Sequence, residues 1–102
     1  MIKTTIYVGL NDKETKVQKI NILEAYKIAQ NILTKKVDGA TIYEASGIYK
    51  HENGAVVIEQ TLRIEILNVS EQIIDELIKT LKIVFNQESV LVQNEDVNIR
   101  FV

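Results

Sequence analysis

Three consecutive polar side chains, Gln87, Glu88 and Ser89, combine an amide, a carboxylate and a hydroxyl where a helical apolar pattern changes to a strand pattern. Such groups can bond the free carbonyls of a helix end or the backbone of a neighbouring loop. The same trio can also bind a polar ligand. The pattern favours the structural role and leaves ligand binding open.

His51 is the only histidine, and the chain contains no cysteine. A site with several histidine or thiolate ligands is therefore excluded, so we predict no metal site. Motifs for phosphate loops, nucleophilic serines and zinc peptidases do not occur, and we expect no cofactor. His51 could act as a general base at the mouth of a pocket, but Lys50 and Glu52 beside it favour a solvated position at a hairpin tip.

The dipeptide Asn53-Gly54 separates two β-rich segments and predicts a hairpin with a two-residue type I′ turn, because both positions of that turn need positive φ. This turn sets Tyr43 against Ile64 on an apolar face and Glu44 against Arg63 on the opposite face. Glu44 and Arg63 could then form a polar surface that binds a small anion or a partner strand. A solvated sheet face is the commoner outcome, and one exposed ion pair contributes only about 0 to 1 kcal/mol.

Six elements must position these groups. The predicted elements are a strand over Lys3–Gly9, a helix over Ile22–Val37 with Gly39 as its left-handed terminator, two strands within Thr41–Leu67, a helix over Glu71–Phe85, and a last strand over Val90–Val102 that is split at Asn94-Glu95-Asp96. Asn21 and Ser70 are the expected helix caps. The β-α-β-β-α-β order is the ferredoxin-like plan, an α+β fold with two helices on one face of an antiparallel sheet. The predicted core includes Leu62, Ile64, Leu77 and Leu81.

Length and composition restrict the function classes. A chain of 102 residues with 46% hydrophobic residues fits a single domain over residues 1–102. The net charge of −2 and the dispersed basic residues give no electrostatic footprint for nucleic acid. No apolar run is long enough for a membrane span and the N-terminus has no signal-peptide pattern, so we expect a cytoplasmic location.

The residues also resemble a known family. The segments that carry the resemblance are Tyr7-Val8-Gly9-Leu10, Asp38 to Gly47, His51-Glu52-Asn53-Gly54 and Phe85 to Val90. Over nearly the whole chain, the sequence is similar to a family of small bacterial proteins of unknown function with an aromatic-x-Gly-Leu start and a Gln-Glu-Ser-Val junction. Tyr49 stands where those proteins often have tryptophan, and Asn86 where they often have glycine. The family has no established activity, so the resemblance implies a fold and no function.

Functions from different classes remain open. The favoured one is a non-enzymatic domain that acts as a homo-oligomer and binds a small molecule or a protein. The alternative is a small enzyme without metal or cofactor, in which tyrosine, His51 and Glu88 are the available acid–base groups. A component of a phage or mobile element that binds a host protein is compatible with the small size, but no motif supports it.

The predicted register also indicates a surface for self-association. Two helices cover one face of the sheet, and Ile42, Ile48, Val57 and Leu67 fall on the other face, where nothing else in 102 residues covers them. A mixed apolar face of this kind is commonly closed by a second subunit. We therefore expect a homodimer through the open face of the sheet.

Overall fold

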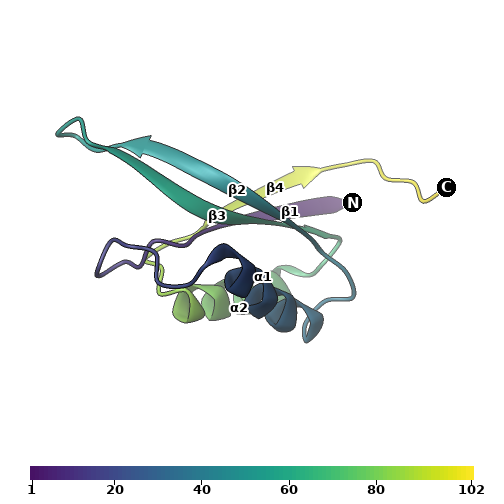
Figure 1. The fold of residues 1–102 in the computed structure, drawn as a ribbon. Helices are drawn as coiled ribbons and strands as arrows, with labels where there is room; N and C mark the ends of the chain where they lie inside the picture. The colour runs from purple at the N-terminus through teal and green to yellow at the C-terminus, as the bar shows by residue number, and fades with distance from the viewer.

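The computed structural model describes residues 1–102, which form one four-stranded antiparallel sheet with two helices on one of its faces (Figure 1). The elements are β1 (Ile2–Gly9), α1 (Ile22–Thr34), β2 (Thr41–Lys50), β3 (Val56–Leu67), α2 (Glu71–Val84) and β4 (Leu91–Asp96). The strand order is β2-β3-β1-β4. The predicted ferredoxin-like β-α-β-β-α-β fold is confirmed.

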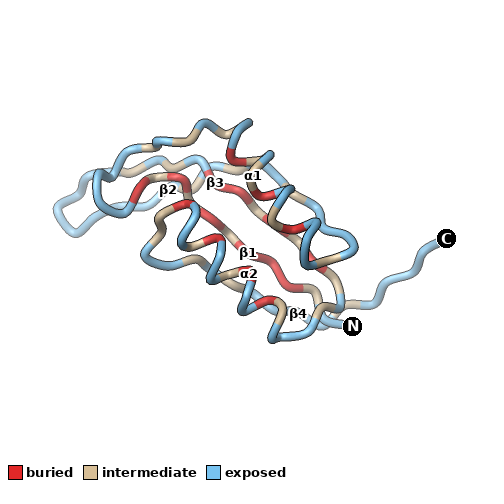
Figure 2. Tube along the Cα trace, turned by 90° about the horizontal axis from the view of Figure 1, so that it is seen from below, coloured by how far each residue is buried: buried red, intermediate tan, exposed pale blue.

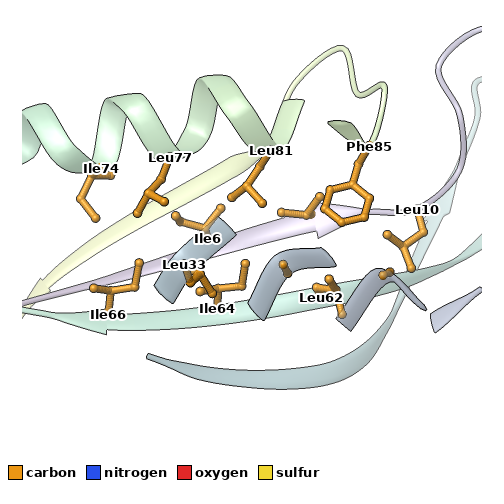
Figure 3. Close-up of a cluster of buried hydrophobic side chains, with 13 residues drawn as sticks. Ile6, Leu10, Leu33, Leu62, Ile64, Ile66, Ile74, Leu77, Leu81 and Phe85 are labelled. Atoms are coloured by element: carbon orange, nitrogen blue, oxygen red, sulfur yellow. The ribbon is translucent and has the colours of Figure 1, made fainter. Parts of the chain in front are cut away.

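The core lies between the helices and the face of the sheet beneath them, which we call the covered face. Ile6 of β1 and Leu62 and Ile64 of β3 are 0% exposed there, and Leu77 and Leu81 of α2 pack against them (Figure 3). Buried residues follow the centres of β1 and β3, whereas the hairpin tip and the chain end are exposed (Figure 2). The four predicted core residues are confirmed.

Side chains cap the starts of both helices as predicted. Asn21 Oδ1 accepts a hydrogen bond from Glu24 N at 2.9 Å, and Ser70 Oγ accepts one from Ile73 N at 3.3 Å. Each bond satisfies one of the backbone donors that a helix start leaves without an intrahelical partner. The sequence therefore located both helix starts.

The end of α1 differs from the prediction. The helix ends at Thr34, and its cap Lys35 has a right-handed conformation. The amides of Lys36 and Val37 both donate to Leu33 O, at 3.0 and 2.9 Å, and so close the last turn. Gly39 does not have the left-handed conformation that was predicted for it, because these bonds already terminate the helix upstream.

The end of α2 uses a left-handed residue at Asn86, whose φ is 48°. Asn86 N donates to Ile83 O at 3.2 Å, and Gln87 N donates to Lys82 O at 2.9 Å. This pair of bonds is a Schellman motif, which satisfies two free carbonyls of the helix. Asparagine tolerates the left-handed region better than most residues, which explains why it replaces the glycine frequent at this position in the resembling family.

The turn of the β2–β3 hairpin differs from the predicted one. His51 N donates to Ala55 O, and Gly54 N donates to His51 O, each at 2.9 Å. Gly54 has a φ of 87°, whereas Asn53 does not have positive φ. The loop is therefore a three-residue type I turn followed by a left-handed glycine, and the two-residue type I′ prediction is wrong.

One extra loop residue shifts the register of the whole hairpin. Tyr43 pairs with Arg63, and Glu44 pairs with Leu62. Because successive residues of a strand point to opposite faces, the shift exchanges the faces of β2 relative to the prediction. Tyr43 and Tyr49 consequently lie on the face without helices, which we call the open face, and they are 43% and 47% exposed rather than part of the core.

The same shift removes the predicted dimer surface. Ile42 faces the covered side and packs against the core. Ile48 also lies on that side, beyond the helices, and is 72% exposed. Only Val57 and Leu67 are on the open face, so the four residues do not form one apolar surface there.

The last strand is also different from its prediction. β4 continues through Asn94, Glu95 and Asp96, because these polar residues have partners on β1. Asn94 Oδ1 accepts a hydrogen bond from Thr4 Oγ1 at 2.9 Å, and Glu95 Oε1 lies 3.1 Å from Lys3 Nζ. Residues 97–102, predicted as the second half of the strand, form no strand and extend away from the body (Figure 1).

Neither helix is long and apolar enough to cross a membrane.

Candidate functional site

A cavity of about 500 Å³, which we call the corner pocket, lies where the hairpin extends past the end of β1. Its lining residues are Asn11, Asp12, Lys13 and Lys16 of the β1–α1 loop, Tyr49, His51, Val57 and Glu59 of the hairpin, and Gln87, Glu88 and Ser89 of the α2–β4 loop. Four of the six candidate residues from the sequence, His51, Gln87, Glu88 and Ser89, therefore line one cavity.

Asp12 organises the β1–α1 loop from a position that is only 6% exposed. Its Oδ1 accepts hydrogen bonds from the amides of Glu14 and Thr15, each at 2.9 Å, and its Oδ2 accepts one from Asn86 Nδ2 at 2.7 Å. These donors, the Asn86 amide first and then the Thr15 amide, outweigh burial and hold the pKa of Asp12 well below its usual range. Asp12 is therefore ionised and ties one wall of the pocket to the other.

Gln87 joins the same two loops. Its Nε2 donates to Asn11 O at 2.8 Å and to Phe85 O, next to the end of α2, at 3.1 Å. The structural role predicted for this side chain is thus present in the structure. Gln87 and Asn86 together fix the α2–β4 loop against the β1–α1 loop.

Glu59 lies across the end of β1 at Gly9. A Cβ at Gly9 would overlap the Glu59 carboxylate, so only glycine lets this side chain cross the strand. Glu59 Oε2 accepts a hydrogen bond from Asn11 N at 2.8 Å. Glu59 was not among the candidate residues predicted from the sequence, and Gly9 of the aromatic-x-Gly-Leu segment was the only local sign of a close approach.

The hairpin contributes two rings to the pocket. Tyr49 and His51 pack edge to face, with centroids 5.5 Å apart and an interplanar angle of 84°. Tyr49 is 47% exposed, so part of its ring remains available for contact with a planar group. His51 lies at the start of the exposed hairpin turn, as predicted for a tip residue.

Several polar groups of the pocket have no side-chain partner within the chain. Glu88, Ser89 and His51 make no side-chain hydrogen bond, and Glu59 uses one of its two carboxylate oxygens. The pocket therefore offers two carboxylates, a hydroxyl and an imidazole, together with the ammonium groups of Lys13 and Lys16 and the Tyr49 ring. No group of three or more histidine, aspartate and glutamate side chains is arranged to hold a metal ion.

The remaining two candidates, Glu44 and Arg63, lie elsewhere and on opposite faces of the sheet. Glu44 lines a shallow cavity with Ile22, Ser46 and Gln60 on the covered side. Arg63 lies on the open face. The predicted surface of Glu44 and Arg63 is therefore wrong, because it depended on the two-residue turn.

Arg63 belongs to a polar cluster on the open face. Its Nη2 donates to Glu65 Oε2 at 2.7 Å, and its guanidinium carbon lies 4.9 Å from the ring centroid of Tyr43 and 5.9 Å from that of Tyr7. Glu65 Oε1 accepts a hydrogen bond from Tyr43 OH at 2.9 Å, and Lys3 Nζ lies 3.5 Å from Oε2. Most of these groups have a partner within the cluster, although the buried Nε of Arg63 has no hydrogen-bond partner. The mutual contacts favour a structural role.

The cluster shifts the pKa of its members. Burial alone would raise the pKa of Glu65, but the Tyr43 hydroxyl and the charges of Arg63 and Lys3 together lower it. The same hydrogen bond to Glu65 raises the pKa of Tyr43. The pKa of Lys3 is also raised, first by its hydrogen bond with Glu95. The neighbours therefore favour the charged forms of Glu65 and Lys3 and the neutral form of Tyr43.

The fold assigns the chain to a class of proteins, and its sequence assigns it to a family. The β-α-β-β-α-β order with sheet order β2-β3-β1-β4 defines a ferredoxin-like α+β protein. Residues 3–101 match the family described as a protein of unknown function (DUF3574), and the chain belongs to that family. The resemblance found in the sequence to a family of unknown function is confirmed. No curated protein sequence matches the chain.

Several solved structures are similar. A phage SAM lyase in complex with S-methyl-5′-thioadenosine has a TM-score of 0.68 and 25% identity, covering 93% of this chain and 80% of the lyase. The periplasmic divalent cation tolerance protein CutA from Archaeoglobus fulgidus has a TM-score of 0.59 and 15% identity, covering 97% and 87%. CutA1 from Oryza sativa has a TM-score of 0.56 and 21% identity, covering 97% and 84%. At these identities the two CutA proteins share the fold alone.

Proposed function

We propose that the chain is a self-associating, non-enzymatic domain that binds a small organic ligand in the corner pocket. The observation that carries the proposal is that His51, Glu59 and Glu88, from two segments far apart in the sequence, converge on one cavity. Its volume of about 500 Å³ lies within the range of about 300 to 1,000 Å³ typical of small-molecule sites.

The free groups of the pocket favour a particular ligand chemistry. Glu88 and the free oxygen of Glu59 accept hydrogen bonds and favour a positively charged group, and the Tyr49 ring favours a planar partner. Lys13 and Lys16 in the same lining favour a carboxylate on the ligand. A purine nucleoside that carries a sulfonium or amino group combines these properties. The likeness to the phage lyase, whose complex contains S-methyl-5′-thioadenosine, supports this class of ligand.

Calorimetric titration with S-adenosylmethionine, S-methyl-5′-thioadenosine, adenosine and methionine tests the proposal. We expect at least one adenosine compound to bind, and methionine alone to bind less well because it lacks the planar base. Binding should also raise the melting temperature as the ligand concentration increases. A chain that binds none of the four compounds would contradict the proposed ligand class.

Matched variants locate the site. Glu59→Gln and Glu88→Gln should each weaken binding about tenfold or more, because a hydrogen bond to a charged group is worth about 1.5 to 3 kcal/mol. Glu44→Gln removes a hairpin carboxylate on the covered side, outside the pocket, and should leave binding unchanged. Equal weakening by all three variants would indicate a general charge effect and would contradict a site in the corner pocket.

A second candidate function is that of a small enzyme without metal or cofactor that cleaves S-adenosylmethionine. The observation that favours it is the identity of 25% over 93% of the chain with a SAM lyase. Release of S-methyl-5′-thioadenosine breaks the bond from the sulfonium sulfur to the amino-acid side chain, and the electron pair stays on sulfur. In the same step the amino-acid carbon chain either loses a proton from the neighbouring carbon to a base, for which His51 and Glu88 are available, or its own carboxylate displaces the sulfur and closes a lactone.

Chromatography separates the two functions. Incubation of the chain with S-adenosylmethionine should yield S-methyl-5′-thioadenosine faster than a heat-denatured control if the enzyme function holds. The variants His51→Asn and Glu88→Gln would then slow the release. Binding with no release above the control supports the non-enzymatic function.

A further inference from the structure

The extended tail, residues 97–102, has the sequence of a strand but no partner strand. Its apolar residues Val97, Ile99 and Phe101 alternate with Asn98 and Arg100, a pattern typical of a half-buried strand. Val97 N donates to Met1 O at 2.9 Å, and the following residues join no ladder. Phe101 is 89% exposed. The family match extends to residue 101, so most of the tail belongs to what the family shares.

The outer edge of β2 is a strand edge that nothing covers. The sheet order puts β2 at the edge over ten residues, and the chain has no proline that would block pairing there. Near the hairpin tip, the cross-strand pair Ile48 and Ile58 is 72% and 68% exposed on the covered side, beyond the helices. Both an unpaired backbone edge and an apolar pair are thus available to a strand.

The tail and the hairpin tip lie at opposite ends of a molecule whose longest dimension is 47 Å (Figure 1). The tail of one chain therefore cannot reach the exposed isoleucine pair of the same chain. Their charges are complementary, since the tail carries Arg100 and no acidic side chain, whereas the hairpin has a net negative charge. Its charged residues are Glu44, Glu52, Glu59 and Glu65 against Lys50 and Arg63. The tail and the outer edge of β2 therefore belong to the same sequence, but they can contact each other only between two copies of the chain.

We propose that residues 97–102 of one copy pair as a strand with the outer edge of β2 in a second copy, with Ile99 and Phe101 packed against Ile48 and Ile58. Main-chain hydrogen bonds then provide affinity and the alternate apolar side chains provide register. Alternation sends Arg100 to the open side of β2, where Tyr43 and Tyr49 lie. The contact joins different surfaces of the two copies, so it is heterologous and closes only by forming a ring.

This inference deepens the self-association in the proposed function and rests on that part of it alone. Ligand binding in the corner pocket and association through the tail can each be wrong while the other is right. A chain that ends at Asp96 and still binds S-methyl-5′-thioadenosine retains the pocket while it lacks the tail. A full chain that associates through the tail but binds no adenosine compound retains the interface without the ligand.

Sedimentation velocity of the full chain at micromolar to submillimolar concentration tests the pairing. We expect a species heavier than the 11.6 kDa of one chain. Removal of residues 97–102 and the variant Phe101→Lys should each return the mass to one chain, because a lysine cannot be buried without a partner for its charge. Ile83→Lys is the matched control, since Ile83 is 71% exposed on α2 and belongs to neither surface. Circular dichroism confirms that each variant is folded.

Mixing two variants makes the test specific. Ile48→Lys has a defective edge and an intact tail, whereas Phe101→Lys has an intact edge and a defective tail. Each alone should have the mass of one chain, and an equal mixture should regain a two-chain species through the one intact contact. A full chain that stays at one-chain mass, an oligomer that survives removal of the tail, or a mixture without any heavier species would overturn the proposal.

Discussion

On the covered face of the sheet, Ile6, Leu62 and Ile64 are fully buried under two helices, whereas on the open face Thr5, Arg63 and Glu65 have no second layer above them. Thr5 is nevertheless only 2% exposed, and the Glu65 side chain is 16% exposed. Long polar side chains on neighbouring strands can bury each other's apolar stems and keep their charged ends paired. The centre of a sheet face can therefore be closed by its own cross-strand contacts, while residues nearer its edges, such as Tyr49 and Leu91, stay exposed.

The two faces should respond differently to truncation, and the covered face should show the largest effect. Leu77→Ala should lower the free energy of unfolding by about 2 to 5 kcal/mol, because Leu77 is 1% exposed and its removal leaves a cavity in the core. Leu91, 63% exposed on the open face, is the matched control, and Leu91→Ala should change stability by less than about 0.5 kcal/mol. Denaturant titration measures both. Similar losses of unfolding free energy for Leu77→Ala and Leu91→Ala would contradict the assignment of the core to the covered face alone.

On the open face, the largest effect should come from Arg63. Arg63→Ala removes the contacts with Tyr43 and Glu65 and should destabilise the fold by about 1 to 2 kcal/mol. Arg63→Lys keeps the charge but loses the planar group that stacks on the rings, so it should recover only part of the loss. Full recovery by lysine in a denaturant titration would show that charge alone holds the cluster.

The hairpin loop determines which residues of β2 lie on the covered face and which on the open face. A change at Gly54 tests the left-handed conformation on which this loop depends. Gly54→Ala should cost about 1 kcal/mol, because alanine disfavours the left-handed conformation at a φ of 87°. Gly54→Asn should cost less, since asparagine tolerates that region, and Gly39→Ala is a control at a glycine with nothing near its Cβ position. If Gly54→Ala were as mild as Gly39→Ala in thermal melts, the left-handed conformation at Gly54 would be the wrong assignment.

The smallest expected effect is a dependence of stability on pH through Glu65. Its pKa in the folded chain lies below the ordinary value of 4.5, so its stabilising contribution is present above that value and is lost as the pH falls towards the lowered pKa. Glu65→Gln should remove this part of the acid sensitivity. The measurement is the free energy of unfolding between neutral pH and a pH of about 3. Identical pH profiles for the two proteins would show that Glu65 does not contribute.

The pH dependence of Asp12 in the corner pocket can be compared with that of Glu65 on the open face. The pKa of Asp12 is lowered as well, by hydrogen bonds from Asn86 and from the loop amides rather than by cations first. Its contribution should therefore persist to lower pH and depend less on salt than that of Glu65, because screening acts on charge pairs more than on short hydrogen bonds from neutral donors. Stability profiles at low and high salt distinguish the two carboxylates.

Much of the fold was predictable from the sequence because its signals are local. The caps Asn21 and Ser70 marked both helix starts, and the helical spacing of Leu77 and Leu81 identified the buried stripe of α2. The run Gln87-Glu88-Ser89 was correctly associated with the end of α2, where Gln87 makes the predicted backbone bonds. Local spacing could not show that His51, more than thirty residues earlier in the chain, lines the same cavity.

Sequence signals were sufficient for the order of elements, the core residues of β3 and the starts of both helices, because capping and periodicity depend on residues a few positions apart. Only the tertiary structure decided the hairpin register, since Asn-Gly is compatible with a two-residue and a three-residue loop and the choice depends on strand pairing. The same pairing placed Glu44 and Arg63 on opposite faces and kept Asn94 to Asp96 within β4. The corner pocket likewise required tertiary structure, because hydrogen bonds between loops distant in sequence bring its walls together.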